Sequence, residues 1–268
     1  MSTHGPILVI KFGGNAMTSP DLFISFAQDV ISLREQGFCI VISHGGGPQI
    51  SEMLSRLNIE SEFVDGLRVT TAEIASVVAT VLSGEVQRTL VTALNTHQVP
   101  AVGVSGEDAK VFTSTRLVDQ EFDLGQVGTV AFVDPKLIYV LLDNGFIPVV
   151  SPVSSTRDGE SLNVNADTVA GSLAGALGAH RLVLMTDVDG VFSAYPDPES
   201  LLSEMTLDQV CELLPSVTQG MIPKLESSIH AMRSGCVSVQ IINGSVEHSL
   251  IKALSTNRNF GTLITPCM

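Results

Sequence analysis

Apolar and polar positions alternate along the chain at two scales. Short apolar runs rich in β-branched residues are separated by longer segments in which apolar residues recur every three or four positions. The short runs are 7–12, 38–43, 101–104, 147–150, 182–186 and 237–242. Continuous apolar runs of this length are typical of strands that are buried on both faces of a parallel sheet.

The longer segments carry signals of helix ends. Ser19 precedes Pro20 and Asp21, the pattern of an N-cap followed by a proline and an acid in the first turn, and Gly37 marks the stop. The segment 71–95 has an apolar stripe too broad for a solvent-exposed helix, so we expect it to be central or to form an oligomer interface. The other expected helices are 48–57, 135–144, 166–177, 206–214 and 223–234.

Two stretches interrupt this alternation. Residues 63–69 and 110–133 have the pattern of hairpins, with Gly125 and Gly128 near the turn of the second. Strands alternating with helices, plus inserted hairpins, predict an α/β fold with a mainly parallel sheet. We expect residues 1–268 to form one domain, in which a weak change of composition at 150–159 separates an N-terminal lobe (about 1–155) from a C-terminal lobe (about 156–268).

Composition narrows the classes of protein. The chain has 268 residues, 44% of them hydrophobic and 16% charged, which suits a packed globular enzyme. A net charge of −14 argues against a partner such as nucleic acid or an anionic membrane, which would require a basic face. Only 5 of the 14 basic residues are lysines, so a lysine in a loop is informative.

Further features bear on compartment and metals. The most apolar stretch, 168–185, is interrupted by His180 and Arg181, and no uninterrupted run reaches the ~18–20 residues of a spanning helix. The first residues lack the pattern of a secretory signal, so we expect a soluble, cytoplasmic protein. The four cysteines are scattered, with no spacing typical of a zinc site or a disulfide scaffold.

Glycine loops follow the first two predicted strands. One contains Gly13 and Gly14, the other Gly45, Gly46 and Gly47, and neither matches a Walker A or dinucleotide-binding motif. A glycine after a strand is often only a turn, but two such loops at the carboxyl ends of parallel strands favour an anionic ligand. Lys11 directly precedes the first loop, where a bound phosphate explains a cation better than a snorkelling side chain does.

Polar residues gather at three later positions. Asn163, Asn165 and Asp167 open a helix of small residues, where one N-cap would suffice and several ligands are therefore indicated. Lys224 lies in the first turn of another helix, where the helix dipole disfavours a cation unless an anion compensates it. Arg68 precedes a threonine N-cap and suits a carboxylate ligand.

In series, these motifs resemble the amino acid kinase family, and within it the members that phosphorylate N-acetyl-L-glutamate. The resemblance runs from Ile7 to Thr265 and rests on "IKFGGNA", "HGGGPQI", "GLRVT", "LNVNAD", "LMTDVDGV", "GMIPK" and "FGTLI" in family order. It implies an αβα sandwich and transfer of a phosphoryl group from ATP, with Mg²⁺, to the side-chain carboxylate of N-acetyl-L-glutamate in arginine biosynthesis. The acyl amino acid would bind the N-terminal lobe and ATP the C-terminal lobe.

The resemblance also implies roles for individual residues. Lys11 and Lys224 would flank the transferring phosphoryl group, and Asp167 would hold both lysines. The acyl amino acid would contact Gly45, Gly46, Arg68 and Asn163, its carboxylate reaching the backbone amides of the glycines. The nucleotide would contact Gly13, Gly14, Thr186, Asp187, Gly190, Phe192 and Met221. No protein ligand for Mg²⁺ is expected, because phosphates and water would hold the ion.

Some positions depart from the family pattern. Glu107 stands where relatives usually have a lysine, in a peripheral loop. The residues before Ile7 and the stretch 251–262 lack features of arginine-inhibited members, so we expect an enzyme insensitive to arginine, and a homodimer with the 71–95 helix at its interface. Three alternatives stay open: a kinase of the same fold acting on another acid such as carrier-bound aminoadipate, a non-catalytic nucleotide sensor, and, more weakly, a Rossmann oxidoreductase.

Overall fold

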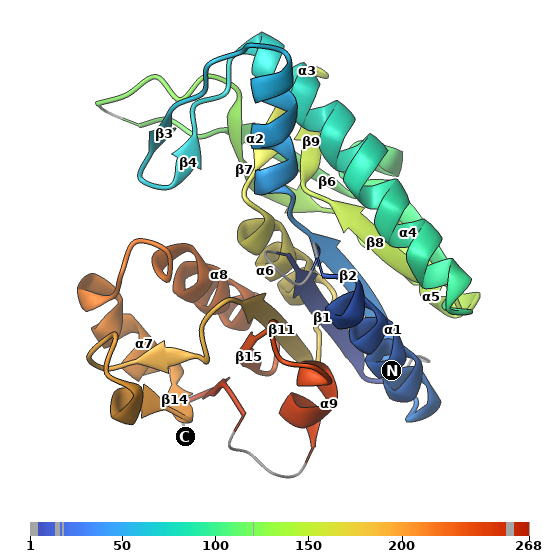
Figure 1. The fold of residues 1–268 in the computed structure, drawn as a ribbon, viewed down its shortest axis with the longest axis vertical. Helices are drawn as coiled ribbons and strands as arrows, with labels where there is room; N and C mark the ends of the chain where they lie inside the picture. Colours follow the sequence, from blue (N-terminus) through green and yellow to red (C-terminus); the bar gives the residue numbers. More distant parts are fainter. Residues whose placement is uncertain (1–4, 14–16, 18, 120, 256–259, 268) are drawn as a thin grey trace.

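The structure is a computed structural model that describes residues 5–13, 17, 19–119, 121–255 and 260–267. Gly14, predicted to contact the nucleotide, lies outside the described residues, as do residues 256–259 of the stretch considered for arginine inhibition. An eight-stranded sheet runs through the molecule, and its central strands lie between the upper and lower parts in Figure 1. Its strands, in spatial order, are β14 (Glu204–Thr206), β16 (Thr262–Thr265), β15 (Val239–Asn243), β11 (Arg181–Thr186), β1 (Ile7–Phe12), β2 (Cys39–His44), β8 (Ile147–Ser151) and β5 (Ala101–Ser105).

Strand β1 lies inside this sheet and pairs in parallel with β2 on one side and β11 on the other. The pairing of β15 with β16 is antiparallel, and the other neighbouring pairs of the sheet are parallel. Strands β2, β5 and β8, which end by residue 151, extend the sheet in one direction from β1, and strands β11, β14, β15 and β16, which begin at residue 181 or later, extend it in the other. The strand order therefore reverses at β1, the position where open α/β sheets bind ligands.

Helices cover both faces of the sheet, because β1 presents Ile7 and Val9 to one face and Leu8 and Ile10 to the other. The first face is covered by α5 (Lys136–Asp143), α6 (Ala166–Ala176), α7 (Leu207–Leu213) and α8 (Ile222–Arg233). The opposite face is covered by α1 (Pro20–Glu35), α4 (Gln87–Thr96) and α9 (Ser249–Leu254). The expected α/β fold with a mainly parallel sheet between helical layers is confirmed.

The predicted 71–95 helix is one continuous rod with a change of winding. It consists of α3 (Ala72–Ala79), a π-helical segment η2 (Thr80–Val86) and α4. The side chain of Gln87 donates hydrogen bonds to the carbonyls of Val104 (2.7 Å) and Val149 (2.9 Å), which ties the rod to strands β5 and β8. By length and composition alone, 72–96 is the one helix among the described residues that could cross a membrane. The apolar window of this helix is 44% buried within the structure, partly through contacts with β5 and β8.

Smaller sheets complete the fold. The hairpin β3 (Phe63–Val64) and β4 (Leu67–Arg68) projects beside α2 (Gly47–Arg56), as Figure 1 shows. Strands β6 (Phe112–Arg116), β7 (Val127–Val133), β9 (Val153–Ser155) and β10 (Ser161–Val164) close into a small barrel, and β12 (Val191–Phe192) pairs with β13 (Leu201–Leu202). Both predicted hairpins are present, but Gly128 lies inside β7 rather than in the turn. A Cβ there would lie 3.0 Å from the Cβ of Leu162 in β10, so the packing of the barrel favours glycine at this position.

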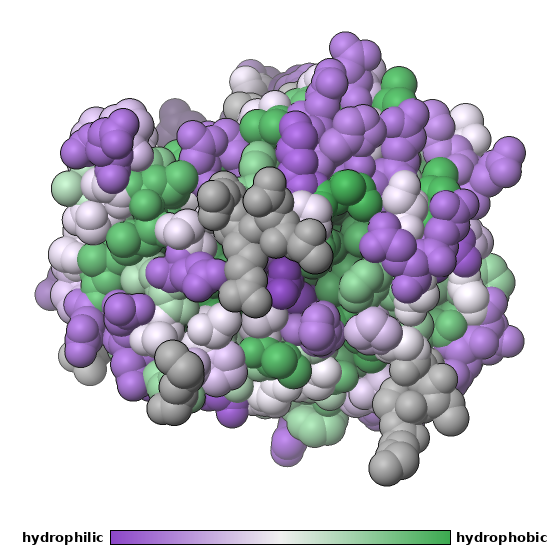
Figure 2. Space-filling view, turned by 90° about the horizontal axis from the view of Figure 1, so that it is seen from below, coloured by the Kyte–Doolittle hydropathy of each residue, from purple (hydrophilic) through white to green (hydrophobic). Residues whose placement is uncertain are grey.

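The surface mixes hydrophilic and hydrophobic residues. In the view from below, hydrophilic residues are spread over most of the visible face and hydrophobic ones form patches between them (Figure 2). The two-lobe division near residue 155 stays a prediction, since the central sheet contains strands from both sides of that boundary.

Candidate active site

The candidate site lies at the carboxyl ends of β1, β2 and β11. Lys11 is the penultimate residue of β1 and pairs with Ser43 of β2 and Leu184 of β11. Successive side chains of a strand point to opposite faces, so Lys11 lies on the same face as Ile7 and Val9. This face is covered by α6 and α8, which carry the other two residues predicted to act with Lys11.

Two lysines share one buried carboxylate. Lys11 Nζ lies 3.1 Å from Asp167 Oδ1, and Lys224 Nζ lies 3.3 Å from Asp167 Oδ2. Lys224 also donates to the carbonyl of Gly220, at 3.3 Å. The side chains of the lysines keep exposures of 13% and 15%, against 7% for that of the aspartate. Two ammonium groups with one carboxylate leave a net positive charge that is accessible to an anion.

The ionisation of Asp167 is decided by opposing effects. Burial by itself raises the pKa of its carboxyl, because a charge is poorly solvated inside the protein. The charges of Lys11 and Lys224, and the hydrogen bonds they offer, outweigh burial and hold the pKa of Asp167 below its ordinary value. Asp167 is therefore ionised at neutral pH.

Helix packing aligns the residues of this triad. Asp167 lies in the first turn of α6 and Lys224 in the first turn of α8, and the two helices pack side by side. A Cβ added to Gly171 would lie 2.7 Å from the carbonyl oxygen of Ser227, and one added to Gly175 would lie 2.5 Å from the Cβ of Ser234. The small residues of α6 thus let α8 approach closely. The cation that opposes the dipole of α8 is compensated within the protein by Asp167.

The glycine loops approach each other beside Lys11. A Cβ on Gly13 would lie 3.3 Å from Lys11 Nζ and 3.7 Å from the amide nitrogen of Gly45, so its absence leaves space around the ammonium group. The Gly45 amide donates to the carbonyl of Phe12 at 3.1 Å, and is thus engaged within the protein. A Cβ on Gly46 would lie 2.6 Å from Leu82, which gives a packing reason for this glycine. Substrate contact by Gly45 and Gly46 stays a prediction.

Arg68 is a buried cation with neutral partners. Its guanidinium donates to Ser61 Oγ (2.5 Å), Ser51 Oγ (2.8 Å) and the carbonyl of Gly47 (3.3 Å), and it stacks 4.5 Å from the ring centroid of Phe63. Burial lowers the pKa of the guanidinium from its ordinary value. The side chain nevertheless stays protonated at neutral pH, as arginine does in proteins. Within the described part of the chain, no carboxylate forms an ion pair with Arg68. A buried cation of this kind is suited to an anionic ligand at the start of α2.

The three polar residues around the start of α6 serve separate purposes. Asn163 donates from its side chain to Thr70 Oγ1, at 3.2 Å, and so faces the segment that carries Arg68. Asn165 is the N-cap of α6, with its Oδ1 accepting from the amides of Asp167 (2.8 Å) and Thr168 (3.3 Å). Asn165 therefore serves as a structural cap, whereas the side chains of Asn163 and Asp167 contact other elements.

A second part of the site is a cavity of about 460 Å³ beside Lys224. This volume is within the range of pockets that bind small molecules and cofactors. Its walls include five residues predicted from the sequence for nucleotide binding or catalysis, namely Thr186, Asp187, Phe192, Met221 and Lys224. Gly190 is not part of its lining: a Cβ there would lie 2.6 Å from Thr262 Oγ1, so this glycine permits close packing of the loop on β16.

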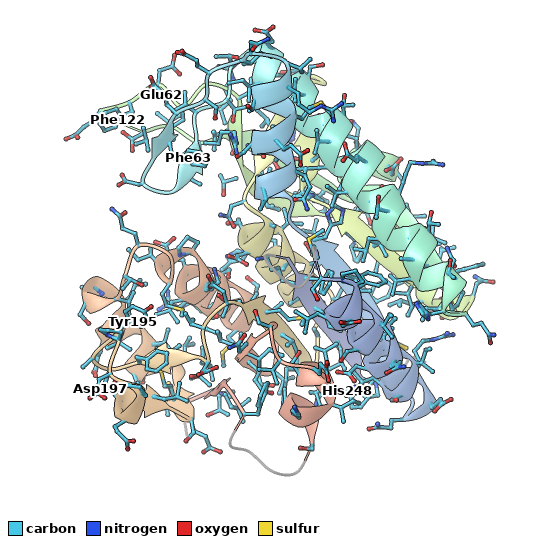
Figure 3. The ribbon with its side chains drawn as sticks, in the orientation of Figure 1. Glu62, Phe63, Phe122, Tyr195, Asp197 and His248 are labelled. Carbon is cyan, nitrogen blue, oxygen red and sulfur yellow. The ribbon has the colours of Figure 1, made fainter. Side chains whose placement is uncertain are left out.

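Sequence reasoning missed part of this cavity. Tyr195, Val217 and Thr218 also line it, and the Tyr195 ring meets that of Phe192 edge-on, with centroids 5.7 Å apart. In the sequence, the tyrosine in "FSAYPD" was the one sign of a further aromatic residue near this site. Loop residues have no periodic pattern, so nothing else marked Tyr195 as part of a binding cavity. Figure 3 shows Tyr195 in the lower part of the molecule and Phe63 in the upper part, where Phe63 belongs to the same β3–β4 hairpin as Arg68.

Comparisons with known proteins agree with this geometry. The family model described as "Amino acid kinase family" matches residues 6–243. Acetylglutamate kinase of Salinispora tropica is 48% identical over 98% of this chain and 90% of its own length, and that of Corynebacterium jeikeium is 48% identical over 97% and 83%. 

Among solved structures, N-acetylglutamate synthase from Neisseria gonorrhoeae, complexed with coenzyme A and N-acetyl-glutamate, is similar with a TM-score of 0.86. It is 24% identical, which shows a shared fold, and the similarity covers 99% of this chain but 60% of the synthase chain. The match of the family model over most of the chain, together with relatives at 48% identity, establishes that this chain belongs to the amino acid kinase family.

Proposed function

We propose that the protein transfers the γ-phosphoryl group of ATP to the side-chain carboxylate of N-acetyl-L-glutamate, giving N-acetyl-L-glutamyl 5-phosphate and ADP in arginine biosynthesis. The observation that carries this proposal is the pair of lysines on Asp167, one of which, Lys224, also lines the cavity. The names of the full-length relatives support the choice of acceptor.

The chemistry requires positioning and charge neutralisation. A carboxylate is already ionised at neutral pH, so the acceptor needs no general base before it attacks the phosphorus atom. Lys11 and Lys224 lie on either side of Asp167 and would stabilise the negative charge on the transferring group. Asp167 keeps both ammonium groups in place and prevents them from repelling each other.

The cavity beside Lys224 would take the nucleotide, with Phe192 and Tyr195 offering aromatic surface to the base. The described residues contain no cluster of three or more acidic, histidine or cysteine side chains that could enclose a metal ion. A site of this kind fits Mg²⁺ held by phosphate oxygens and water, and Asp187 is the acidic residue among those that line the cavity. The ion would neutralise phosphate charge in the complex.

The acceptor would lie in the N-terminal lobe between Lys11, Arg68 and Asn163. Arg68 would bind a carboxylate of the acyl amino acid, since its charge is buried among neutral groups. The division into an acceptor lobe (about 1–155) and a nucleotide lobe (about 156–268) is part of this proposal. So are a homodimer formed through the 72–96 rod and insensitivity to arginine, which sedimentation and an assay at millimolar arginine would test.

A hydroxylamine-trapping assay tests the reaction directly. The protein is given MgATP and, in separate reactions, N-acetylglutamate, glutamate, aspartate or aminoadipate. We expect hydroxamate from N-acetylglutamate alone, because an acyl phosphate reacts with hydroxylamine. Hydroxamate from a different acid would replace the proposed substrate, and none from any acid would overturn the proposed reaction.

Two lysine variants make the assay specific for the site. Lys224→Ala should lose about 100-fold or more in kcat, the usual effect of removing a charge-stabilising donor. Lys136→Ala is the matched control, because Lys136 is 88% exposed and pairs with Asp134 on the surface. Equal activity of the two variants would contradict the role given to Lys224.

A further inference from the structure

A buried histidine lies directly before the second glycine loop. His44 is the last residue of β2 and is fully buried. Its Nδ1 lies 2.9 Å from the carbonyl oxygen of Gly45. A carbonyl can only accept a hydrogen bond, so Nδ1 carries the proton and Nε2 is the unprotonated nitrogen. Nε2 is buried and has no hydrogen-bond partner among the described residues.

The imidazole is held in its neutral form. Burial lowers the pKa of His44 to about 4, although its bond to Gly45 acts in the opposite direction. A second proton on Nε2 would place an unpartnered N–H and a positive charge in the interior, which is costly. His44 therefore presents one fixed donor to the loop at neutral pH, and it has no exposed atom with which to exchange protons with a substrate.

The hydrogen bond fixes a particular peptide plane. In a trans peptide the carbonyl and the following N–H point in opposite directions. Because His44 holds the Gly45 carbonyl, the N–H of Gly46 is directed away from the imidazole. The neighbouring groups are also tied: the Gly45 amide donates to Phe12, and the Gly47 carbonyl accepts from Arg68. The Gly46 amide has no such partner within the described residues, and it lies at the N-terminus of α2, where backbone amides favour anions.

We propose that His44 is a positioning residue: it orients the Gly45–Gly46 peptide so that the Gly46 amide donates a hydrogen bond to an anionic oxygen of the acceptor. This inference rests on the proposed function for its substrate. It assigns the contact of the glycine loop to one amide, that of Gly46, because the Gly45 amide is already engaged by Phe12.

Two amide variants test this role. In His44→Asn the side-chain nitrogen reaches the position of Nδ1, whereas in His44→Gln it reaches that of Nε2. We expect His44→Gln to lose about 10- to 100-fold in kcat/KM for N-acetylglutamate, the range seen when a supporting hydrogen bond to a reactive site is removed. His44→Asn should stay within about 3-fold of the wild type, since it keeps the donor. The KM for ATP should change little in either variant. Equal losses in both variants, or a loss expressed mainly in the KM for ATP, would overturn the inference.

A measurement on the wild type does not depend on variants that fold. ¹⁵N NMR should show His44 protonated on Nδ1 and unchanged between pH 6 and pH 9. Adding N-acetylglutamate should shift the Gly46 amide proton downfield, with the Gly45 amide much less affected. A Gly46 amide that is insensitive to a ligand that binds would refute the positioning role. If the wild type neither binds nor phosphorylates N-acetylglutamate, the proposed function fails, whatever the tautomer of His44.

Discussion

The acceptor and nucleotide regions of this site are built in different ways. Around Arg68 and the glycine loop, buried groups are tied to one another by short hydrogen bonds, and the side chain of Arg68 is fixed by three partners. Around the cavity, the walls come from loops and helix ends, and Tyr195 is 57% exposed (Figure 3). If the regions act as proposed, the acceptor region would be suited to selecting one small acid, and the nucleotide region would accommodate a larger ligand through surface contact.

Asp167→Asn removes the carboxylate that both regions share, and we expect the largest effect from it. The variant keeps the shape of the side chain but leaves two ammonium groups without a counter-charge, so kcat should fall by about 100-fold or more. Steady-state kinetics with both substrates measures this loss. Asp134→Asn, at a surface ion pair, is the control. A variant with near-normal kcat would show that Asp167 does not organise the lysines.

The same aspartate makes stability depend on pH. Its pKa is lower in the folded protein than in the unfolded chain, so its ion pairs contribute fully above the ordinary carboxyl pKa of about 4. That contribution disappears as the pH falls through the lowered value. The difference in free energy of unfolding between the wild type and Asp167→Asn, measured in urea, should therefore shrink from pH 7 toward pH 3. A difference that stays constant would contradict the assigned ion pairs.

Arg68→Met tests the acceptor region alone. Methionine retains much of the apolar stem but loses the charge, so the KM for N-acetylglutamate should rise by about 30-fold, the equivalent of ~2 kcal/mol. The KM for ATP should remain close to that of the wild type. Arg56→Met, at the exposed end of α2, is the matched control. Parallel increases in both KM values would erase the distinction between the two regions.

Tyr195→Ala should have the smallest effect, because its ring forms one wall of an open cavity. Losing an aromatic surface for the base is expected to raise the KM for ATP by about 5- to 10-fold, with little change for the acyl amino acid. Phe132→Ala removes an equally exposed ring from β7, outside the cavity, and should leave both constants unchanged. A change in the KM for the acyl amino acid alone would contradict the assignment of Tyr195 to the nucleotide region.

Elements of the fold could be predicted where neighbouring residues in the sequence specify them. The extent of β1 was predicted to the residue, and Ser19 caps α1 as expected, because apolar runs and caps are written in neighbouring residues. Strands β9, β10 and β16 were missed, since each has only three or four residues. β9 and β10 pair with each other locally, but their places in the barrel depend on β6 and β7, which lie earlier in the chain. The same applies to α9, whose amides of Leu250 and Ile251 donate to the buried Asp29 of α1.

At the site, it was easier to predict which residues come together than to predict why each residue type is required. The triad of Lys11, Asp167 and Lys224 was expected from motifs, and the structure brings its members together. Gly46 and Gly190 were expected to contact ligands, which stays a prediction, and the structure adds a packing reason for each glycine, because Leu82 and Thr262 lie where a Cβ would be. A glycine in a sequence can indicate that there is no room for a side chain, but only the packing shows which neighbouring residue occupies that room.

The shared sheet limits how the two regions can move. Strand β1 carries Lys11, and strand β11, which leads to Thr186 and the cavity, pairs with it residue by residue from Leu8 to Lys11. No flexible linker therefore separates the acceptor strand from the nucleotide strand. Movement of one region relative to the other at this junction would require a change in the twist of the sheet, shared by several hydrogen-bonded strands. If the two substrates bind as proposed, the shared sheet would therefore set the distance between them.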